Sequence, residues 1–301
     1  MSIAFIDADL LVYRCAFVAQ TRRYDLVDKL SGVTIQSFRY AKNKEVDVWE
    51  DGEKVGKEII PGYNNWIEDN IEKDRRDTVE IRADWDLKPI SFAFQALDST
   101  VRAIKEAVET DEYRFYLTEG ESNFRKELAT ILPYKGNRKE KPIYFEELRD
   151  YMLHEYDAIL CQGYEADDAI VDDYEAGYEL EDVIVSTDKD LFQQPGRFYN
   201  FVNEEFIDIS EEEAMFSYWQ QVLTGDMTDN IPGLPGVGPK TAEKILANST
   251  TNKEMQEAVT KEYKHRLNNT KKGKEFLNQC KKSWSEVLYE IEELIKLGRP
   301  D

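Results

Sequence analysis

Five carboxylates fall within a short stretch of the chain, between residues 163 and 190. They are Glu165, Asp167, Asp168, Asp188 and Asp190. The first three stand at the start of a predicted helix, and the last two follow a short apolar run. Like charges a few Å apart repel, so some of these groups must protonate or bind a cation. A hard divalent ion such as Mg²⁺ takes oxygen ligands and keeps some of its waters. The stretch therefore predicts one half of an acidic metal site.

Acidic residues also follow other predicted strands. Asp7 comes after the strand 2–6, Glu119 after 113–117, and Asp188 after 183–186. Strands and helices alternate along the chain, which predicts an α/β fold with a mostly parallel sheet covered on both faces. Ligands in such folds bind beyond the carboxyl ends of the strands. The three acids are therefore expected to converge at one edge. Asp7 and Asp9 suit the cap of the next helix equally well.

Composition excludes several classes of protein. The 301 residues include 39 basic and 61 acidic ones, for a net charge of −22, which argues against nonspecific DNA binding. With 41% hydrophobic residues the chain can bury a core. The three scattered cysteines and two histidines predict no zinc site, no imidazole chemistry and a reducing compartment. Neither a signal peptide nor a transmembrane run is evident, so we expect a cytoplasmic protein without a membrane partner.

Two basic regions stand out in this acidic chain. The first, 124–142, carries Lys135 and Arg138 around a predicted turn, with Tyr134 beside them. A lysine and an arginine suit phosphate contact, and the tyrosine ring offers a surface for base stacking. The second region lies in the helical stretch after residue 252. Either region is also compatible with an ordinary solvated surface, which is the usual fate of such runs.

The segment GDMTDNIPGLPGVGPK joins two further features. Asp226 and Asp229 are three apart, so one helical turn would place both on one side. Gly236 and Gly238 then form a tight turn before a helix that begins at Pro239. Free backbone N–H groups at a helix start can hold a DNA phosphate without reading sequence.

Residues 21–89 differ in character from the rest. Alternating valines on either side of Asp51–Gly52 predict a β-hairpin, and the segment is expected to be an insertion outside the core. Four of its aromatic residues could stack on bases but are more often packing residues. They are Tyr40, Trp49, Tyr63 and Trp66.

Six motifs in order, IDAD, YKGNR, EADD, STDKD, GDMTDN and GVGPK, resemble those of the 5′ nuclease family. The family includes flap endonucleases and phage 5′→3′ exonucleases, and the nearest likeness is to the exonucleases of tailed phages. The match covers about residues 2–17 and 98–246. It implies a PIN-like nuclease domain over 1–224, with the insertion inside it, and a helical helix–turn–helix DNA-binding region over 225–301.

The resemblance also implies the chemistry. Two Mg²⁺ or Mn²⁺ ions would cut phosphodiesters near the 5′ ends of double-stranded or branched DNA, in the host cytoplasm for a phage protein. The first metal site would use Asp7, Glu119, Glu165, Asp167 and Asp168, and the second Asp188, Asp190, Asp226 and Asp229. Lys135, assisted by Arg138, would hold the scissile phosphate. DNA contacts would come from Tyr134, Lys135, Arg138, Gly236, Gly238, Lys240 and Thr241, with K⁺ at the helix–turn–helix.

Three departures from the family pattern bear on substrate choice. Glu119 stands where many members have Asp, and Gln220 and Gln221 occupy a helix where some phage members carry Lys. The segment 21–89 matches no motif, although this part of the family holds a helical arch or clamp. Alternatives are a PIN-type ribonuclease, a non-catalytic structure-specific DNA-binding protein and a small-molecule phosphatase. No obligate protein partner is predicted, and flap endonuclease or RNase H activity could accompany exonuclease activity.

Overall fold

The computed structural model describes residues 1–301 except 51–52, 138–139, 178–180 and 300–301. The chain forms two compact units. The first contains Met1–Tyr13, Leu97–Lys141 and Phe145–Asp301, and the second contains Arg14–Ala96 and Pro142–Tyr144. Among the described residues no helix is long and apolar enough to cross a membrane. The predicted division at residue 224 stays a prediction.

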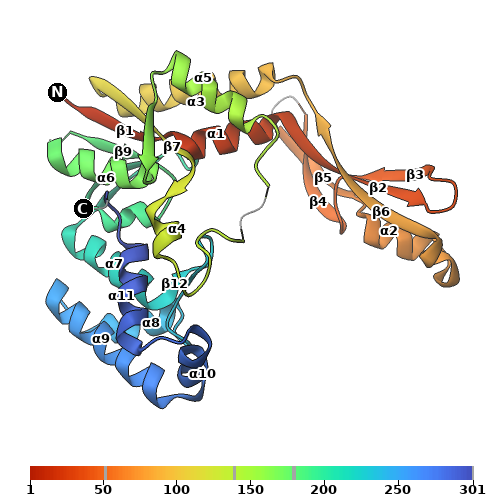
Figure 1. Cartoon of the computed structure of the whole chain (residues 1–301). Helices are drawn as coiled ribbons and strands as arrows, with labels where there is room; N and C mark the ends of the chain where they lie inside the picture. Colours follow the sequence, from red (N-terminus) through yellow and green to blue (C-terminus); the bar gives the residue numbers. More distant parts are fainter. Residues whose placement is uncertain (51–52, 138–139, 178–180, 300–301) are drawn as a thin grey trace. The chain divides into compact units, whose positions relative to one another are not determined.

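A six-stranded sheet forms the centre of the first unit (Figure 1). Its strand order is β11-β10-β9-β1-β7-β8, and every neighbouring pair is parallel except β10 and β11. The strands are β1 (Ile3–Asp7), β7 (Glu112–Asn123), β8 (Ile159–Gly163), β9 (Val183–Val185), β10 (Gly196–Asn200) and β11 (Glu205–Ile209). Buried apolar runs such as β9 are typical of parallel strands covered on both faces. The predicted α/β fold is therefore confirmed.

Helix α6 (Ala166–Gly177) packs against β1, β7 and β8. Its apolar residues join those of the strands in one core cluster, in which the rings of Phe5 and Tyr174 lie 5.5 Å apart edge to face. In Figure 1, α3 (Ser91–Val108) and α5 (Phe145–Glu155) lie on the other side of the sheet. Because β1 is buried on both faces, Asp7 at its end is held in a fixed place.

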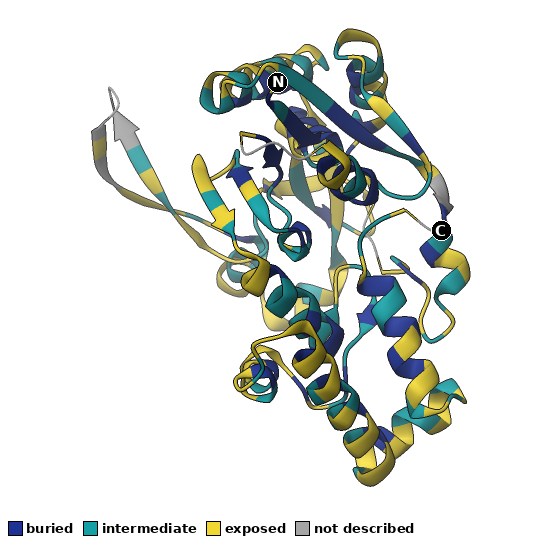
Figure 2. Ribbon diagram, turned by 90° about the vertical axis from the view of Figure 1, so that its left-hand side faces the viewer, coloured by how far each residue is buried: buried dark blue, intermediate teal, exposed yellow. Residues whose placement is uncertain are grey.

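The remaining helices of the first unit are amphipathic, with buried and exposed residues alternating along them (Figure 2). They are α7 (Glu211–Thr224), α8 (Pro239–Leu246), α9 (Asn252–Asn269), α10 (Lys271–Cys280) and α11 (Trp284–Ile295). Short elements complete the unit: α4 (Phe124–Leu128), β12 (Gly225–Asp226), β13 (Ile231–Pro232) and the 3₁₀ turn η3 (Asp190–Gln193). A capping box of Ser210 and Glu213 opens α7, and Tyr263 donates to the Val222 carbonyl at 2.5 Å.

The second unit is rich in β-structure. Strands β2 (Gln20–Asp28), β3 (Thr34–Phe38) and β6 (Val79–Leu87) form an antiparallel sheet, and β4 (Lys44–Glu50) pairs with β5 (Glu53–Ile60). Helix α2 (Tyr63–Asn70) and the turns η1 (Phe17–Ala19) and η2 (Lys73–Thr78) accompany them. Helix α1 (Ala8–Ala16) crosses from the first unit into this one. The strands of the expected hairpin are present, whereas its turn residues lie outside the described part.

Aromatic residues of the second unit pack on one another. The rings of Tyr24 and Tyr63 are 5.1 Å apart, and those of Phe38 and Trp66 are 5.7 Å apart. The ammonium group of a lysine lies 4.8 Å from the centre of the Tyr40 ring. These contacts therefore support a packing role for the aromatic residues rather than base stacking. For Trp49 the structure gives no side-chain position.

Two element boundaries differ from the sequence predictions. Asp98 and Ser99 are residue types that cap helices and predict a helix start there. Helix α3 instead begins at Ser91, about two turns earlier, because the apolar face already starts upstream. Strand β7 continues past Leu117 to Asn123, with an irregular pairing to β8 between Thr118 and Asn123. The second difference changes the position of Glu119.

Candidate metal centre

Asp7 lies at the carboxyl end of β1 and is 3% exposed. Its Oδ1 accepts a hydrogen bond from the Leu10 backbone N–H at 3.2 Å, so the side chain caps α1. Its Oδ2 accepts from the Ser186 hydroxyl at 3.0 Å, across the neighbouring strand end. Both interpretations of Asp7 therefore hold: it caps a helix and faces the carboxyl edge of the sheet.

Asp167 and Asp188 join Asp7 at this edge. Burial raises the pKa of Asp7 to about 7, and the charges of Asp9 and Asp188 add to the effect. Burial also raises the pKa of Asp167 well above its usual range, and repulsion from Asp7, Asp188 and Glu165 adds to it. Carboxyl groups that raise one another's pKa by charge repulsion are close in space, because that repulsion falls with distance. The structure thus brings together acids from β1, from α6 and from the loop after β9.

Three more acids border this group. Burial raises the pKa of Asp190 to about 7, with further repulsion from Asp188, Asp226 and Asp229. Asp190 also accepts a hydrogen bond from Gln221 Nε2 at 2.6 Å. Burial raises the pKa of Asp226 in turn.

The expected helical turn over Asp226 and Asp229 is wrong. These residues lie in a hairpin, where Gly225–Asp226 pairs with Ile231–Pro232 in antiparallel fashion. Gly225 and Gly233 make the hairpin possible, since a Cβ on Gly233 would lie 2.1 Å from the Thr224 carbonyl oxygen. The hairpin presents both acids to the cluster without a helix.

Lys135 reaches the cluster from the loop after α4. Its ammonium group bonds to Glu165 Oε1 and lies 3.3 Å from Asp229 Oδ2, and the side chain is 15% exposed. Its backbone N–H donates to the Asp229 carbonyl at 2.8 Å, which fixes the loop on the hairpin. Burial opposes ionisation of Glu165, but the charge and hydrogen bonds of Lys135 outweigh it and lower the pKa of Glu165. The lysine is therefore a counter-ion inside the cluster, not the exposed group that a turn predicts.

Tyr134 is a correction to the sequence analysis. Tyr134 is only 6% exposed, so its ring offers no surface on which a base could stack. Its hydroxyl oxygen is 2.7 Å from both Glu165 Oε2 and Asp229 Oδ2. Burial and these two charges raise the pKa of Tyr134, so the phenol keeps its proton and can donate it to one carboxylate at a time.

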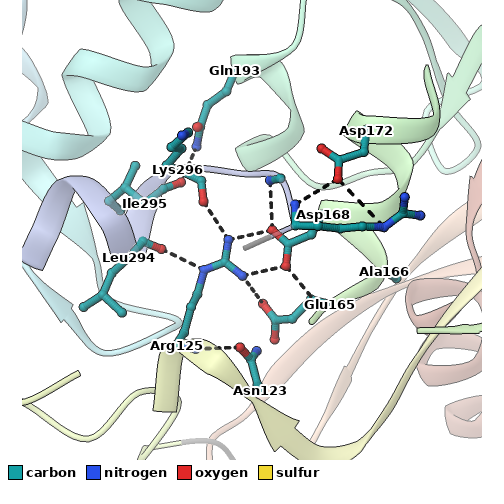
Figure 3. A network of polar contacts seen from close by, with 12 residues as sticks. Asn123, Arg125, Glu165, Ala166, Asp168, Asp172, Gln193, Leu294, Ile295 and Lys296 are labelled. Carbon is teal, nitrogen blue, oxygen red and sulfur yellow. Dashed lines mark hydrogen bonds and ion pairs between the residues drawn. The ribbon is translucent and has the colours of Figure 1, made fainter. Parts of the chain in front are cut away.

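Asp168 is expected to be a metal ligand, but in the structure its carboxylate pairs with Arg125. Its carboxylate receives both ends of the Arg125 guanidinium, each at 2.7 Å, and both side chains are 1% exposed or less. The Glu165 backbone N–H also donates to Asp168, at 2.9 Å (Figure 3). The physical reason for the correction is helical spacing, because Asp168 follows Asp167 by about 100° around α6 and faces another direction.

Glu119 is a second ligand that the structure does not bring to the cluster. It lies within β7, where its Oε1 accepts from Gln162 Nε2 at 3.2 Å. Asp9, rather than Glu119, is close to Asp7, because its charge helps to raise the pKa of Asp7. Asp9 accepts from the Thr118 backbone N–H at 2.9 Å and from Arg149 at 3.0 Å. Asp9 is the second residue of α1, so the helix that Asp7 caps sets its position.

The remaining predicted residues are Arg138 and those around the turn before α8. Arg138 falls in the undescribed pair 138–139. Gly236, at φ +79°, and Gly238, the N-cap of α8, form an exposed turn that ends at Pro239. Lys240 is exposed and Thr241 is half-buried on the first turn of α8. Their predicted contact with DNA stays a prediction.

The donor set is chemically suited to a hard divalent cation, because it consists of carboxylate oxygens with no sulfur or imidazole. Within the ranges that the structure describes, no three His, Cys, Asp or Glu residues already stand in positions to hold one ion. Mg²⁺ keeps several waters and is often bound by only one or two carboxylates directly.

The first unit is an α/β fold whose mostly parallel sheet gathers acids from β1, from α6 and from the loop after β9 at one edge. The zinc-bound T5 5′-exonuclease shares this fold at a TM-score of 0.50, with 19% identity, over 69% of this chain and 81% of that one. No family model matches the sequence. The sequence does match several curated relatives.

The relatives include DNA polymerase I of Synechocystis sp., 30% identical over 215 residues, which is 61% of this chain and 21% of that protein. DNA polymerase I of Rhizobium leguminosarum is 35% identical over 145 residues, 41% of this chain and 14% of that protein. Flap endonuclease Xni of Vibrio campbellii is 34% identical over 139 residues, 39% of this chain and 52% of that protein. The chain thus spans about half or less of each relative. Together they support the 5′ nuclease family that the motifs indicate.

Proposed function

We propose that this protein is a metal-dependent 5′ nuclease that hydrolyses phosphodiesters near the 5′ ends of duplex or branched DNA. The observation that carries the proposal is the meeting of Asp7, Asp167 and Asp188 at one sheet edge, next to the ammonium group of Lys135. Such a site binds cations and presents a positive charge to a phosphate. The flap endonuclease among the relatives supports the nuclease activity in this proposal.

Divalent ions, two Mg²⁺ or Mn²⁺ in this proposal, would be held by the carboxylates of the cluster. These are Asp7, Glu165, Asp167, Asp188, Asp190, Asp226 and Asp229. When bound, such ions lower the pKa of a water and stabilise charge on a phosphate. The cluster itself is costly without cations, as the pKa values near 7 of Asp7 and Asp190 indicate.

The protein's own groups would hold and orient the substrate. Lys135 would exchange one of its present carboxylate partners for a non-bridging oxygen of the scissile phosphate. The half-buried Thr241 and the exposed turn at Gly236 and Gly238 would contact the duplex backbone through N–H groups at the start of α8, with K⁺ as a further ligand of that turn. Tyr134 would donate a hydrogen bond to a carboxylate of the cluster and so fix its orientation.

A product-size assay tests the proposal. Purified protein is mixed with 5′-labelled blunt, nicked and flapped duplexes, in Mg²⁺ or in EDTA. We expect labelled mononucleotides or short oligonucleotides in Mg²⁺ and none in EDTA. Labelled RNA–DNA hybrids and single-stranded RNA measure RNase H and ribonuclease activity in parallel. Tight binding to flapped DNA without any cleavage would refute the nuclease and favour a non-catalytic DNA-binding protein.

A further inference from the structure

A buried ion pair stands directly behind the proposed metal centre. Arg125 and Asp168 form two hydrogen bonds of 2.7 Å, and neither side chain reaches solvent to more than 1%. Arg125 is the second residue of α4, where its own N–H bonds to the Asn123 side chain at 2.8 Å. The guanidinium also lies 3.9 Å from Glu165. The pair thus touches an acid of the cluster without belonging to it.

The end of α11 completes the environment of this pair (Figure 3). Arg125 Nε donates to the Leu294 carbonyl at 3.0 Å, and its Nη2 donates to the Lys296 carbonyl at 2.7 Å. The Gly298 backbone N–H donates to Asp168 Oδ1 at 3.1 Å. Each Asp168 oxygen therefore accepts one guanidinium and one backbone N–H. The segment Leu294–Gly298 is tied to the start of α6 through both partners.

The same helix end reaches the other side of the cluster. Gln193 Nε2 donates to the Ile295 carbonyl at 3.0 Å and lies 2.6 Å from Gln221 Oε1. Gln221 in turn donates to Asp190. The last carbonyls of α11 therefore support acids on α6 and on η3 together.

We propose that Arg125 is a positioning residue, which uses the segment Leu294–Gly298 to hold the first turn of α6 so that Glu165 and Asp167 are presented to divalent ions. Asp168 adjoins Asp167 and accepts from the Glu165 N–H, so whatever fixes Asp168 fixes the two acids beside it. For its role in cleavage the inference rests on the proposed function, but its direct effect is on ion binding.

Stability alone is a weak reason for such a pair. Removing two charges from water costs about as much as their attraction returns, and well-packed apolar residues in their place are often as stable or more so. What apolar side chains cannot supply is direction. The planar guanidinium fixes four acceptor positions at once, whereas a lysine ammonium at the same place would satisfy fewer of them and hold none in a plane.

The first test replaces Arg125 with lysine, and Arg114 with lysine as a matched control. Arg114 is a partly exposed arginine of β7 that pairs with Glu112. Binding of Mn²⁺ alone is measured by calorimetry at a temperature well below unfolding. Groups that orient metal ligands typically contribute 10–100-fold to metal affinity. We therefore expect Arg125→Lys to weaken Mn²⁺ binding by about tenfold or more, and Arg114→Lys to change it less than about twofold.

The second test does not depend on the folding of an Arg125 variant. Deleting residues 298–301 removes the Gly298 N–H but leaves both carbonyls that accept from Arg125. Deleting only 299–301 also removes the Arg299 bonds to Asp172 and Asp173 but keeps the Gly298 contact, and serves as the control. We expect the longer deletion alone to weaken Mn²⁺ binding. In cleavage assays it should lower kcat while KM for DNA stays within about twofold, because the DNA-contacting turn is untouched.

The outcomes separate the inference from the proposed function. Unchanged Mn²⁺ affinity in both Arg125→Lys and the longer deletion, with only a lower unfolding temperature, would overturn the positioning role. A wild-type protein that binds Mn²⁺ but cuts no DNA would refute the nuclease, and the affinity ratios would still decide the role of Arg125. A wild-type protein that binds no Mn²⁺ would overturn both.

Discussion

Replacing Lys135 with methionine removes one charge from the cluster while keeping most of the side chain's length. The ammonium bonds to Glu165 and lies 3.3 Å from Asp229, so the charge already sits where a phosphate would meet the acids. A preorganised donor aimed at developing charge contributes about 10²–10³ in rate, or about 2.7–4 kcal/mol. We expect Lys135→Met to lower the single-turnover cleavage rate by that factor.

The same variant should change ion binding and stability in opposite directions. Hydrogen bonds to charged groups contribute about 1.5–3 kcal/mol each, so the ion-free protein should lose about 2–3 kcal/mol of unfolding free energy. The remaining carboxylates are then more negative, and Mn²⁺ should bind as tightly as before or more tightly. General damage to the fold would weaken both properties together.

The assay uses excess protein over a 5′-labelled nicked duplex, with urea unfolding in EDTA alongside. The exposed Lys253, at the start of α9, provides the matched control Lys253→Met. A Lys135→Met rate within about threefold of wild type would refute the phosphate-holding role. Unchanged unfolding in EDTA would mean that the lysine does not neutralise these acids.

Three further predictions concern other positions. Asp188→Asn should abolish turnover in Mg²⁺ yet leave binding to flapped DNA intact in a gel-shift assay; cleavage at the normal rate would remove Asp188 from the metal centre. Glu290 accepts three hydrogen bonds from Thr130 and Ile131, and these outweigh its burial and lower its pKa. Because its folded pKa is depressed, its stabilisation is complete above the unfolded value of about 4.3 and is lost as pH falls through the folded value. Glu290→Gln should therefore cost about 2 kcal/mol in urea unfolding at neutral pH, and the difference from wild type should shrink in acid; an equal difference at both pH values would contradict this. Gly233→Ala should lower unfolding free energy by at least about 2 kcal/mol, because its Cβ meets the Thr224 carbonyl, whereas Gly177→Ala, with open space around it, should be nearly neutral.

Much of the fold could be predicted because its signals are local. The apolar runs of β1 and β9 are each followed by an acid, and parallel strands bring their carboxyl ends to one edge. Asp7 and Asp188 are therefore close in space for a reason that is visible in the sequence.

What could not be predicted depends on distant contacts. Arg125 belongs to a basic island that resembles solvated surface, and only Asp168 and the carbonyls of α11 make its burial possible. Tyr134 looks exposed for the same reason. The D-x-x-D spacing at Asp226 suits a helical turn, but pairing of its neighbours with Ile231–Pro232 overrides it. Glu119 was misplaced because β7 runs on through irregular pairing.

The long sequence separation of the contacts around the site has a consequence for how the protein folds. The bond from Ser186 to Asp7 joins residues 179 apart in sequence, and that from Arg125 to Leu294 joins residues 169 apart. Contacts between residues so far apart in sequence form late, because the entropy lost in closing the long loop comes before the contacts stabilise it. A partly folded chain would carry all its aspartates but would not bring them together. After dilution from denaturant, the proposed nuclease activity should return only with the slowest refolding phase. Partly folded molecules would therefore not cleave nucleic acid.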